Sequence, residues 1–224
     1  MSNTSFSFFA PQRRLPAGFL LAACLFLSLP AGCRTLPPLD DRTISSALSP
    51  KIADTTRLGA AVCPVVECHP GLTGFLPLGD AVDAFAARII LANAAEKTLD
   101  VQYYIWRNDV TGILLFEALR QAAERGVRVR LLLDDLPTSG MDNVLAELNN
   151  HPQIEVRLFN PFLYRKFRAL DFILDFPRAH RRMHNKSFTA DNQVTIVGGR
   201  NIGDEYFGAA EGFLFADLDV LAVG

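Results

Sequence analysis

HNKSFTADNQVTIVGGRN, residues 184–201, carries the most informative pattern in this chain of 224 residues. Two short apolar runs, SFTA and VTIV, flank Asp191-Asn192, a residue pair that favours a tight turn. The pattern predicts a β-hairpin with its turn at Asp191-Asn192. His184 and Lys186 stand two residues apart on the first strand, so the alternation of side chains along a strand places both on one face.

The side chains of this stretch suit a phosphate group as their target. Lys186 offers a fixed positive charge that neutralises non-bridging oxygens while the imidazole of His184 attacks phosphorus. Gly198-Gly199 allows the backbone to approach an anion closely, and the Asn201 amide can donate a hydrogen bond to an oxygen. A His-x-Lys pair alone also fits a strand with two polar side chains facing solvent, so the indication comes from the whole spacing.

Helix and strand patterns alternate ahead of the hairpin. In chain order we expect a helix at 81–97, a strand at 99–106, a helix at 111–126, a strand at 127–135, a helix at 139–150 and a strand at 154–160. The run at 127–135, VRVRLLLDD, is nearly continuous in apolar residues at its end, as buried parallel strands are. The order predicts a three-layer α/β domain, with a mixed, largely parallel central sheet and helices on both faces.

The N-terminus has the pattern of an export signal. Residues 15–33 carry no charge, follow Arg13-Arg14 and end in small residues, as a secretory signal does. Ala31-Gly32-Cys33 resembles a bacterial lipobox, which implies lipidation at Cys33. A cleaved soluble form and a retained membrane anchor are the alternatives. All three possibilities place the rest of the chain outside the cytoplasm. Lipidation at Cys33 and a retained anchor would also hold it at a membrane of the bacterial envelope.

A linker is expected between the export segment and the α/β domain. Residues 34–76 are rich in Pro, Thr, Ser and Asp and show little periodicity. The expected division is therefore 1–33, 34–76 and 77–224. Within the linker, Cys63 and Cys68 are close enough for a local disulfide in an oxidising compartment, with two small buried thiols as the alternative. No metal is expected, because His69 beside them does not complete a ligand set.

Residues 159–183, FNPFLYRKFRALDFILDFPRAHRRM, interleave aromatic rings with arginine and lysine. One interpretation is a loop and short helix that cap the core. The other is a surface for anionic lipid, with Arg165, Lys166 and Arg168 at the headgroup phosphates. A nucleic-acid surface would also combine rings with cations, but the net charge of −2 gives the chain no overall basic field.

The spacing within residues 184–201 resembles the signature motif of the phospholipase D superfamily. That motif is named for its His, Lys and Asp. His184, Lys186, Asp191, Gly198 and Asn201 match it, and Gly199 stands where many members carry serine. LDVQYYIWRNDVTG, RGVRVRLLLDD and IEVRLFNPF also resemble the bacterial cardiolipin synthases, most of all their C-type members, from about residue 75 to the last residue. The resemblance implies one of the two usual repeats of a phospholipase D-like α/β sandwich.

The resemblance implies a double displacement without metal or cofactor. One histidine attacks the phosphodiester to form a phosphohistidine, and a second protonates the leaving alcohol and then deprotonates the acceptor. Phosphatidylglycerol as donor and acceptor would give cardiolipin, and water as acceptor would make the protein a phospholipase D. An exported single-motif nuclease acting as a homodimer and an inactive fragment that binds lipid headgroups are further alternatives. The resemblance to the synthases and the aromatic-basic segment favour lipid over nucleic acid.

Three aspartates, Asp191, Asp217 and Asp219, are considered for roles in the site. The position of Asp191 at a turn indicates a structural role through side-chain bonds to backbone. Asp217, in FADLDVLAVG, stands where family members carry a carboxylate that orients the catalytic imidazole, and Asp219 is the second choice.

The mechanism of the family needs two His-Lys sets, and this sequence shows one. The other histidines, His69, His151 and His180, have no lysine two residues later. We therefore expect that a C-terminal repeat beyond this chain supplies the second set, or that two copies of the chain share one site across a two-fold axis.

Overall fold

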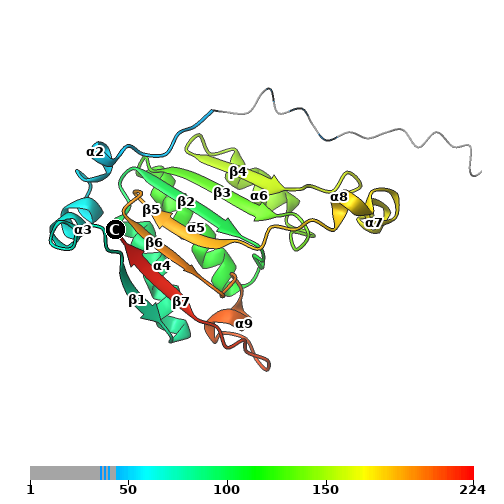
Figure 1. Ribbon diagram of the computed structural model, residues 1–224. Coiled ribbons are helices and arrows are strands. Elements are labelled where there is room, and N and C mark those ends of the chain that lie inside the picture. The colour runs from blue at the N-terminus through cyan, green and yellow to red at the C-terminus, as the bar shows by residue number, and fades with distance from the viewer. Residues whose placement is uncertain (1–35, 37, 39, 41–43) are drawn as a thin grey trace, which may run out of the picture. The chain divides into compact units, whose positions relative to one another are not determined.

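The computed structural model describes residues 36, 38, 40 and 44–224. The expected export segment, with Cys33, lies outside these residues. A single seven-stranded sheet runs through the described part in the order β1-β7-β6-β5-β2-β3-β4 (Figure 1). Its strands are β1 (Gly74–Leu78), β2 (Thr98–Tyr103), β3 (Arg128–Asp134), β4 (Ile154–Phe159), β5 (Lys186–Ala190), β6 (Val194–Gly198) and β7 (Asp219–Val223). None of the helices formed by these residues is long and apolar enough to cross a bilayer.

The expected alternation of helices and strands is confirmed, and the sheet is mixed. The helices are α4 (Ala81–Ala94), α5 (Val110–Glu124) and α6 (Asp142–Asn149), each followed by a strand. Gly126 follows α5 in the left-handed region at φ 91°, which fits its expected place at the stop of that helix. Among the strands of the described residues, only the pairings β2–β3 and β3–β4 are parallel, whereas the other four are antiparallel. The prediction of a largely parallel sheet is therefore wrong.

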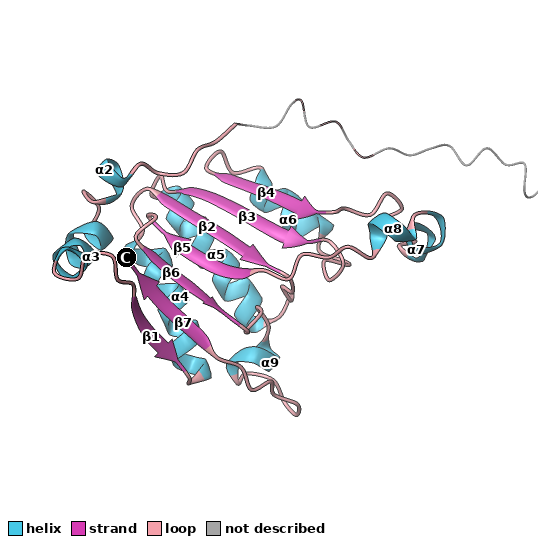
Figure 2. Ribbon diagram, viewed as in Figure 1, coloured by secondary structure: helices cyan, strands magenta, loops and turns pink. Residues whose placement is uncertain are grey.

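Helices cover one face of the sheet, not both as predicted. α4, α5 and α6 lie together behind the strands (Figure 2). The physical reason is that β2, β3 and β4 are added in one direction across the sheet. Right-handed crossovers that advance in one direction place their helices on the same face. Leu99, Val101 and Tyr103 of β2 are buried beneath these helices, while Asp100 and Gln102, which point the other way, are partly exposed.

A buried ion pair joins α4 to β7, the strand next to the edge strand β1. The Arg88 guanidinium donates to Asp219 Oδ2 at 2.8 Å and to the Tyr103 hydroxyl at 2.8 Å, and all three side chains are buried. Asp80 caps the N-terminus of α4, because its carboxylate accepts from the amides of Val82 and Asp83. This arrangement fixes the start of β7 against β2 and α4, which is the part of the sheet next to the candidate site.

Much of the expected linker is folded. Residues 50–78 form α2 (Pro50–Ala53), α3 (Arg57–Glu67) and the edge strand β1, which pairs with β7. The Thr56 hydroxyl caps α3 by accepting from the Gly59 amide at 3.0 Å. Thr56, one of the residues that suggested a linker, therefore acts as a helix cap. Cys63 lies on α3 and Cys68 at its C-terminal end, and both thiols are free, so the disulfide hypothesis is not supported.

The hairpin predicted at residues 184–201 is confirmed. β5 and β6 pair antiparallel, with Ala190 opposite Val194. Asp191 and Asn192 form the turn with φ of 50° and 55°, the left-handed conformation that these two residue types tolerate best among those with a side chain. Between β4 and β5 the chain forms two short helices, α7 (Ala169–Leu174) and α8 (Phe176–Ala179), and α9 (Asp204–Phe207) follows β6.

Candidate active site

Four of the residues predicted from the sequence lie at one edge of the sheet. His184 comes just before β5 and Lys186 begins it, Asn201 follows the end of β6, and Asp217 comes just before β7. β5 and β7 both run antiparallel to β6. The beginnings of β5 and β7 therefore meet the end of β6 at the same edge. The end of β2 joins them there, because Tyr103 pairs with Lys186.

Tyr104, which is not part of the signature motif of residues 184–201, contacts both members of the His-x-Lys pair. Its ring centroid lies 4.3 Å from that of the His184 imidazole and 5.7 Å from Lys186 Nζ. Lys186 Nζ also donates to the His184 carbonyl at 3.0 Å. The two side chains therefore converge on one ring, as the alternation along β5 predicted. The signal for Tyr104 was weak, since it follows Tyr103 in a strand pattern that does not separate a core tyrosine from a site tyrosine.

Asn201 is joined to the same segment of chain. Its Oδ1 accepts from the Ile105 amide at 3.0 Å, and its Nδ2 donates to the Tyr206 hydroxyl at 3.0 Å. The side chain is buried. A primary amide carries two N–H donors, so one donor is left for a ligand after the bond to Tyr206. Tyr104 and Ile105 thus connect the His184–Lys186 pair to Asn201 through two adjacent residues.

Asp217 packs against Gly199 and acts electrostatically on Lys186. A Cβ on residue 199 would stand 2.1 Å from Asp217 Oδ1, so the carboxylate packs directly against the glycine. Burial lowers the pKa of the Lys186 ammonium, and the negative charge of Asp217 partly offsets this effect. The lysine is therefore partly desolvated and electrostatically coupled to Asp217, as is common for charged groups in functional sites.

The space beside Gly198 and Gly199 is filled by residues 217–219 and is not open to an anion. A Cβ on Gly198 would stand 2.1 Å from Asp219 Oδ1 and 2.6 Å from the Leu218 carbonyl oxygen. The Gly199 amide donates to that same carbonyl at 3.0 Å. The expectation that both glycines leave space for an anion is corrected, because the segment ahead of β7 fills the space that their missing side chains provide.

Asp219 is committed to structure and is not available to orient His184. One of its oxygens is paired with Arg88, and the Arg200 guanidinium lies 3.6 Å from the same oxygen. Its other oxygen accepts from the Arg200 amide at 3.1 Å. Asp217, the first choice from the sequence, therefore stands as the candidate carboxylate beside the His-x-Lys pair.

Asp191 matches the superfamily signature together with His184 and Lys186, but its role in the structure is to hold the turn, as its position indicated. Its buried carboxylate accepts from the amides of Glu96, Lys97 and Thr98 at 2.9, 2.7 and 2.9 Å. It follows the last residue of β5, whereas His184 precedes the first. The full length of a five-residue strand, about 17 Å, separates the two. Asp191 joins the hairpin to the start of β2 and does not reach the site.

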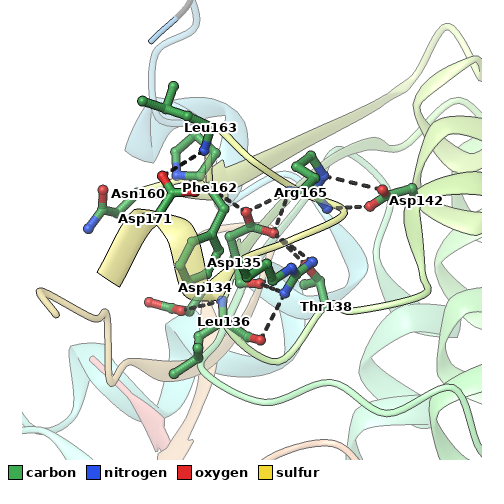
Figure 3. A network of polar contacts seen from close by, with 12 residues as sticks. Asp134, Asp135, Leu136, Thr138, Asp142, Asn160, Phe162, Leu163, Arg165 and Asp171 are labelled. Atoms are coloured by element: carbon green, nitrogen blue, oxygen red, sulfur yellow. Dashed lines mark hydrogen bonds and ion pairs between the residues drawn. The ribbon is translucent and has the colours of Figure 1, made fainter. Parts of the chain in front are cut away.

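Arg165 and Arg168 turn inward rather than toward a lipid surface. Arg165 pairs with the fully buried Asp135 at 2.5 Å and with Asp142 (Figure 3). Arg168 donates to the carbonyls of Asp135 and Leu136 at 2.6 and 2.9 Å. The expectation that both contact headgroup phosphates is therefore corrected. Lys166 remains exposed.

The neighbouring carboxylate, Asp134, holds the residues directly ahead of His184. Its Oδ2 accepts from the Met183 amide at 2.7 Å, and its Oδ1 lies 3.1 Å from the Arg182 guanidinium. Asp134 ends β3 and is fully buried. Asp134 therefore fixes the residues that lead to His184, although β2 separates β3 from β5 in the sheet.

The fold and this edge define a phospholipase D-like protein with one His-x-Lys set in the described residues. The chain belongs to the family described as cardiolipin synthase, PLD-like domain, which matches residues 89–214. The resemblance stated from the sequence is thereby confirmed.

The relatives of the chain agree with this assignment. It is 63% identical over 168 residues to cardiolipin synthase C of Escherichia coli (strain K12), covering 75% of this chain and 36% of that protein. It is 39% identical over 175 residues to an uncharacterized protein of Helicobacter pylori (strain ATCC 700392 / 26695), covering 76% and 34%. The chain thus spans about a third of the length of these relatives. The structure of NucT from Helicobacter pylori shares the fold, with a TM-score of 0.51 and 16% identity over 68% of this chain and 85% of that one.

Proposed function

We propose that the chain carries one half of the active site of a phospholipid phosphatidyltransferase that forms cardiolipin from phosphatidylglycerol. The observation that carries the proposal is the convergence of His184 and Lys186 on Tyr104, beside Asn201. The high identity to a cardiolipin synthase supports lipid as the substrate class. The second His-Lys set comes from a C-terminal repeat or from a second copy of the chain. Nucleic acid is not the substrate in this proposal.

In this proposal the reaction is a double displacement at phosphorus. An imidazole nitrogen of one histidine attacks the phosphodiester, the P–N bond forms, and the P–O bond to the leaving glycerol breaks as the second histidine gives that oxygen a proton. The hydroxyl of the incoming phosphatidylglycerol then attacks phosphorus, gives its proton to the second histidine and releases the first. His184 fills one of these roles, and we assign it the nucleophilic one. If water is the acceptor, the same steps make a phospholipase D.

The neighbours of His184 have distinct proposed roles. Lys186 neutralises the non-bridging oxygens of the phosphoryl group, and the free N–H of Asn201 donates to one of them. Asp217 is the candidate that orients His184, and its charge helps to keep Lys186 protonated. Tyr104 holds the imidazole in place through ring contact.

The proposed location rests on the N-terminal export pattern and on a phospholipid substrate. We propose that it acts at a membrane of the bacterial envelope after export, with a lipid anchor at Cys33. Metabolic labelling with a palmitate analogue tests the anchor, because wild-type protein should be labelled and Cys33→Ser should not. Equal labelling of both would reject an anchor at Cys33.

The site is tested by trapping the covalent intermediate. With both His-Lys sets in place, the enzyme is quenched during turnover of labelled phosphatidylglycerol and assayed for an acid-labile phosphoenzyme. His184→Ala should abolish both label and cardiolipin, and Lys186→Ala should reduce cardiolipin nearly as much. His69→Ala, an exposed histidine on another part of the fold, is the matched control and should retain both.

Two outcomes would change the proposal. If His184→Ala still traps label but forms no cardiolipin, the partner histidine is the nucleophile and His184 is the acid and base. If His184→Ala retains full turnover, the function proposed for this edge of the sheet is wrong.

A further inference from the structure

The segment between β4 and β5 presents apolar side chains outward. Phe167, Ile173, Leu174 and Phe176 are 70%, 76%, 58% and 57% exposed, and Leu170 is 39% exposed. Positions 170, 173 and 174 share one face of α7, because residues three and four apart are neighbours on a helix. We call these five side chains the apolar tip. Side chains of this size are usually scattered singly on a soluble surface, so a cluster of five marks an interaction site.

Most of the arginines of the same segment are paired at its base. Arg178 pairs with the buried Asp171 at 2.7 Å and with Asp175 at 2.6 Å. Arg165 and Arg168 reach Asp135, as described above. The segment thus shows the reverse of an ordinary surface, with ion pairs at its base and hydrocarbon at its outer side. Contact with an apolar medium would stabilise this arrangement, because it would remove the exposed apolar side chains from water.

The base of the apolar tip is rigidly attached. The Asp171 carboxylate accepts from the amides of Leu163 and Tyr164, both at 2.9 Å. Asn160, in the left-handed region at φ 47°, donates to the carbonyls of Arg178 and Arg181, both at 2.7 Å. Both ends of the segment are therefore held together, and the apolar tip is a fixed projection.

The projection stands beside the candidate active site. α7 and α8 extend beyond the ends of β3 and β4 (Figure 1), and α8 ends five residues before His184. On the other side of β5 in the sheet order, the loop ahead of β7 exposes Phe213, Leu214 and Phe215. His184 therefore lies at an edge that has an apolar projection on each side.

We propose that the apolar tip inserts into the hydrocarbon of an anionic bilayer and places His184 at the headgroup level of that bilayer. This inference rests on the proposed function. The choice of a bilayer over a second protein rests on the charges that are left exposed, because both aspartates of residues 159–183 are paired with Arg178, whereas two cations of the segment face solvent. Lys166 and Arg181 are exposed at the base of the tip, where headgroup phosphates would lie. The contact is thus made by buried hydrocarbon with cations around it, and not by the inward-turned arginines.

Tryptophan reporters in the full chain test this contact. Phe167→Trp and Phe176→Trp are made in the His184→Ala background and reconstituted into phosphatidylglycerol vesicles, with or without brominated acyl chains. Ile90→Trp is the matched control, because Ile90 is equally exposed on α4, far from the tip in the sequence and on the helical face. The native Trp106 is buried and its emission is subtracted as background. Because each tryptophan reports only on its own position, a membrane anchor elsewhere in the chain does not by itself produce the signal.

The expected result is that brominated chains reduce the added emission of both tip reporters by roughly twofold or more, as for a side chain 5–10 Å into the membrane, while the Ile90→Trp signal is unchanged. The quenching should persist at high salt, because burial of hydrocarbon is not screened. Quenching no greater than that of Ile90→Trp would overturn the proposal. So would a blue-shifted emission that bromine does not affect, which would mean that protein covers the tip. Neither result depends on turnover, so the proposed function is tested separately.

Discussion

Asp217 and Gly199 occupy complementary space: the carboxylate oxygen Oδ1 of Asp217 lies 2.1 Å from the point where a side chain on residue 199 would begin. The backbone approaches closely as well, since the Gly199 amide donates to the Leu218 carbonyl at 3.0 Å. Any larger residue at position 199 must therefore displace the carboxylate that stands beside Lys186. The serine that many relatives of the superfamily carry here would require a different position for Asp217.

A double-mutant cycle measures this relationship. Gly199→Ala should lower the free energy of unfolding by about 1–3 kcal/mol, because the added methyl group overlaps Asp217. In an Asp217→Ala background the same change should cost much less, since the overlapping carboxylate is gone. Urea unfolding of the four proteins gives the coupling. Gly79→Ala is the control, because a Cβ there meets open space, and additive effects at 199 and 217 would contradict the packing.

The charge of Lys186 depends on Asp217. Burial lowers the pKa of Lys186 and the Asp217 carboxylate partly opposes this, so Asp217→Asn should lower the pKa of Lys186 further. Activity that needs the ammonium is lost as pH rises through this pKa. The alkaline limb of the pH–rate profile should therefore move to lower pH in Asp217→Asn. Titration of the Lys186 side chain by NMR gives the shift directly. An unmoved or higher pKa would show that Asp217 does not act on Lys186.

The sign of the linked stability change follows from the same shift. Because the pKa of Lys186 is lower in the folded than in the unfolded protein, the unfolded chain binds more protons between the two values. Lys186 therefore destabilises the fold while it is charged in both states. This penalty is relieved as pH rises from the folded toward the unfolded pKa. Asp217→Asn lowers the folded pKa further and so extends to lower pH the range over which stability rises with pH.

The hairpin and the order of helices and strands could be predicted because their signals are local. The turn at Asp191-Asn192 and the stop at Gly126 are set by backbone preferences that a single residue carries. The location of Lys186 and Asn201 at the same end of the hairpin could also be predicted, since Lys186 begins its first strand and Asn201 follows its second. The single helical face could not, because it depends on the order of strands in the sheet. The sequence shows the strands but not which neighbours they choose.

The roles of Arg165 and Arg168 could not be predicted for a related reason. Their partner Asp135 lies 30 and 33 residues earlier in the chain, and only the fold brings them together. The spacing within residues 159–183 is equally compatible with arginines facing lipid. The folded state of residues 50–78 was missed because Thr56 serves as a cap within a stretch whose composition is typical of a linker.

Asp135 should hold the apolar tip to the sheet. The fully buried carboxylate accepts from the Phe162 amide at 2.7 Å and pairs with Arg165, so Asp135→Asn should lower the free energy of unfolding by about 3–5 kcal/mol. Hydrogen exchange at residues 161–183 should rise more than in α4 or α5. Asp142→Asn, which removes the exposed second partner of Arg165, should cost about 1 kcal/mol or less. Equal losses from the two variants would mean that Asp135 does not organise the segment.

Asp191 should matter for stability and not for chemistry. Asp191→Ala removes the acceptor of three backbone amides and places alanine at φ 50°, so the free energy of unfolding should fall by roughly 2–4 kcal/mol. The matched control is Asn192→Gly, at the exposed neighbouring position with φ 55°, where glycine relieves backbone strain and stability should hardly change. At a temperature where the variant is folded, cardiolipin formation per folded molecule should equal that of wild type. A large loss of turnover in fully folded Asp191→Ala would place this carboxylate in the reaction despite its distance along β5 from His184.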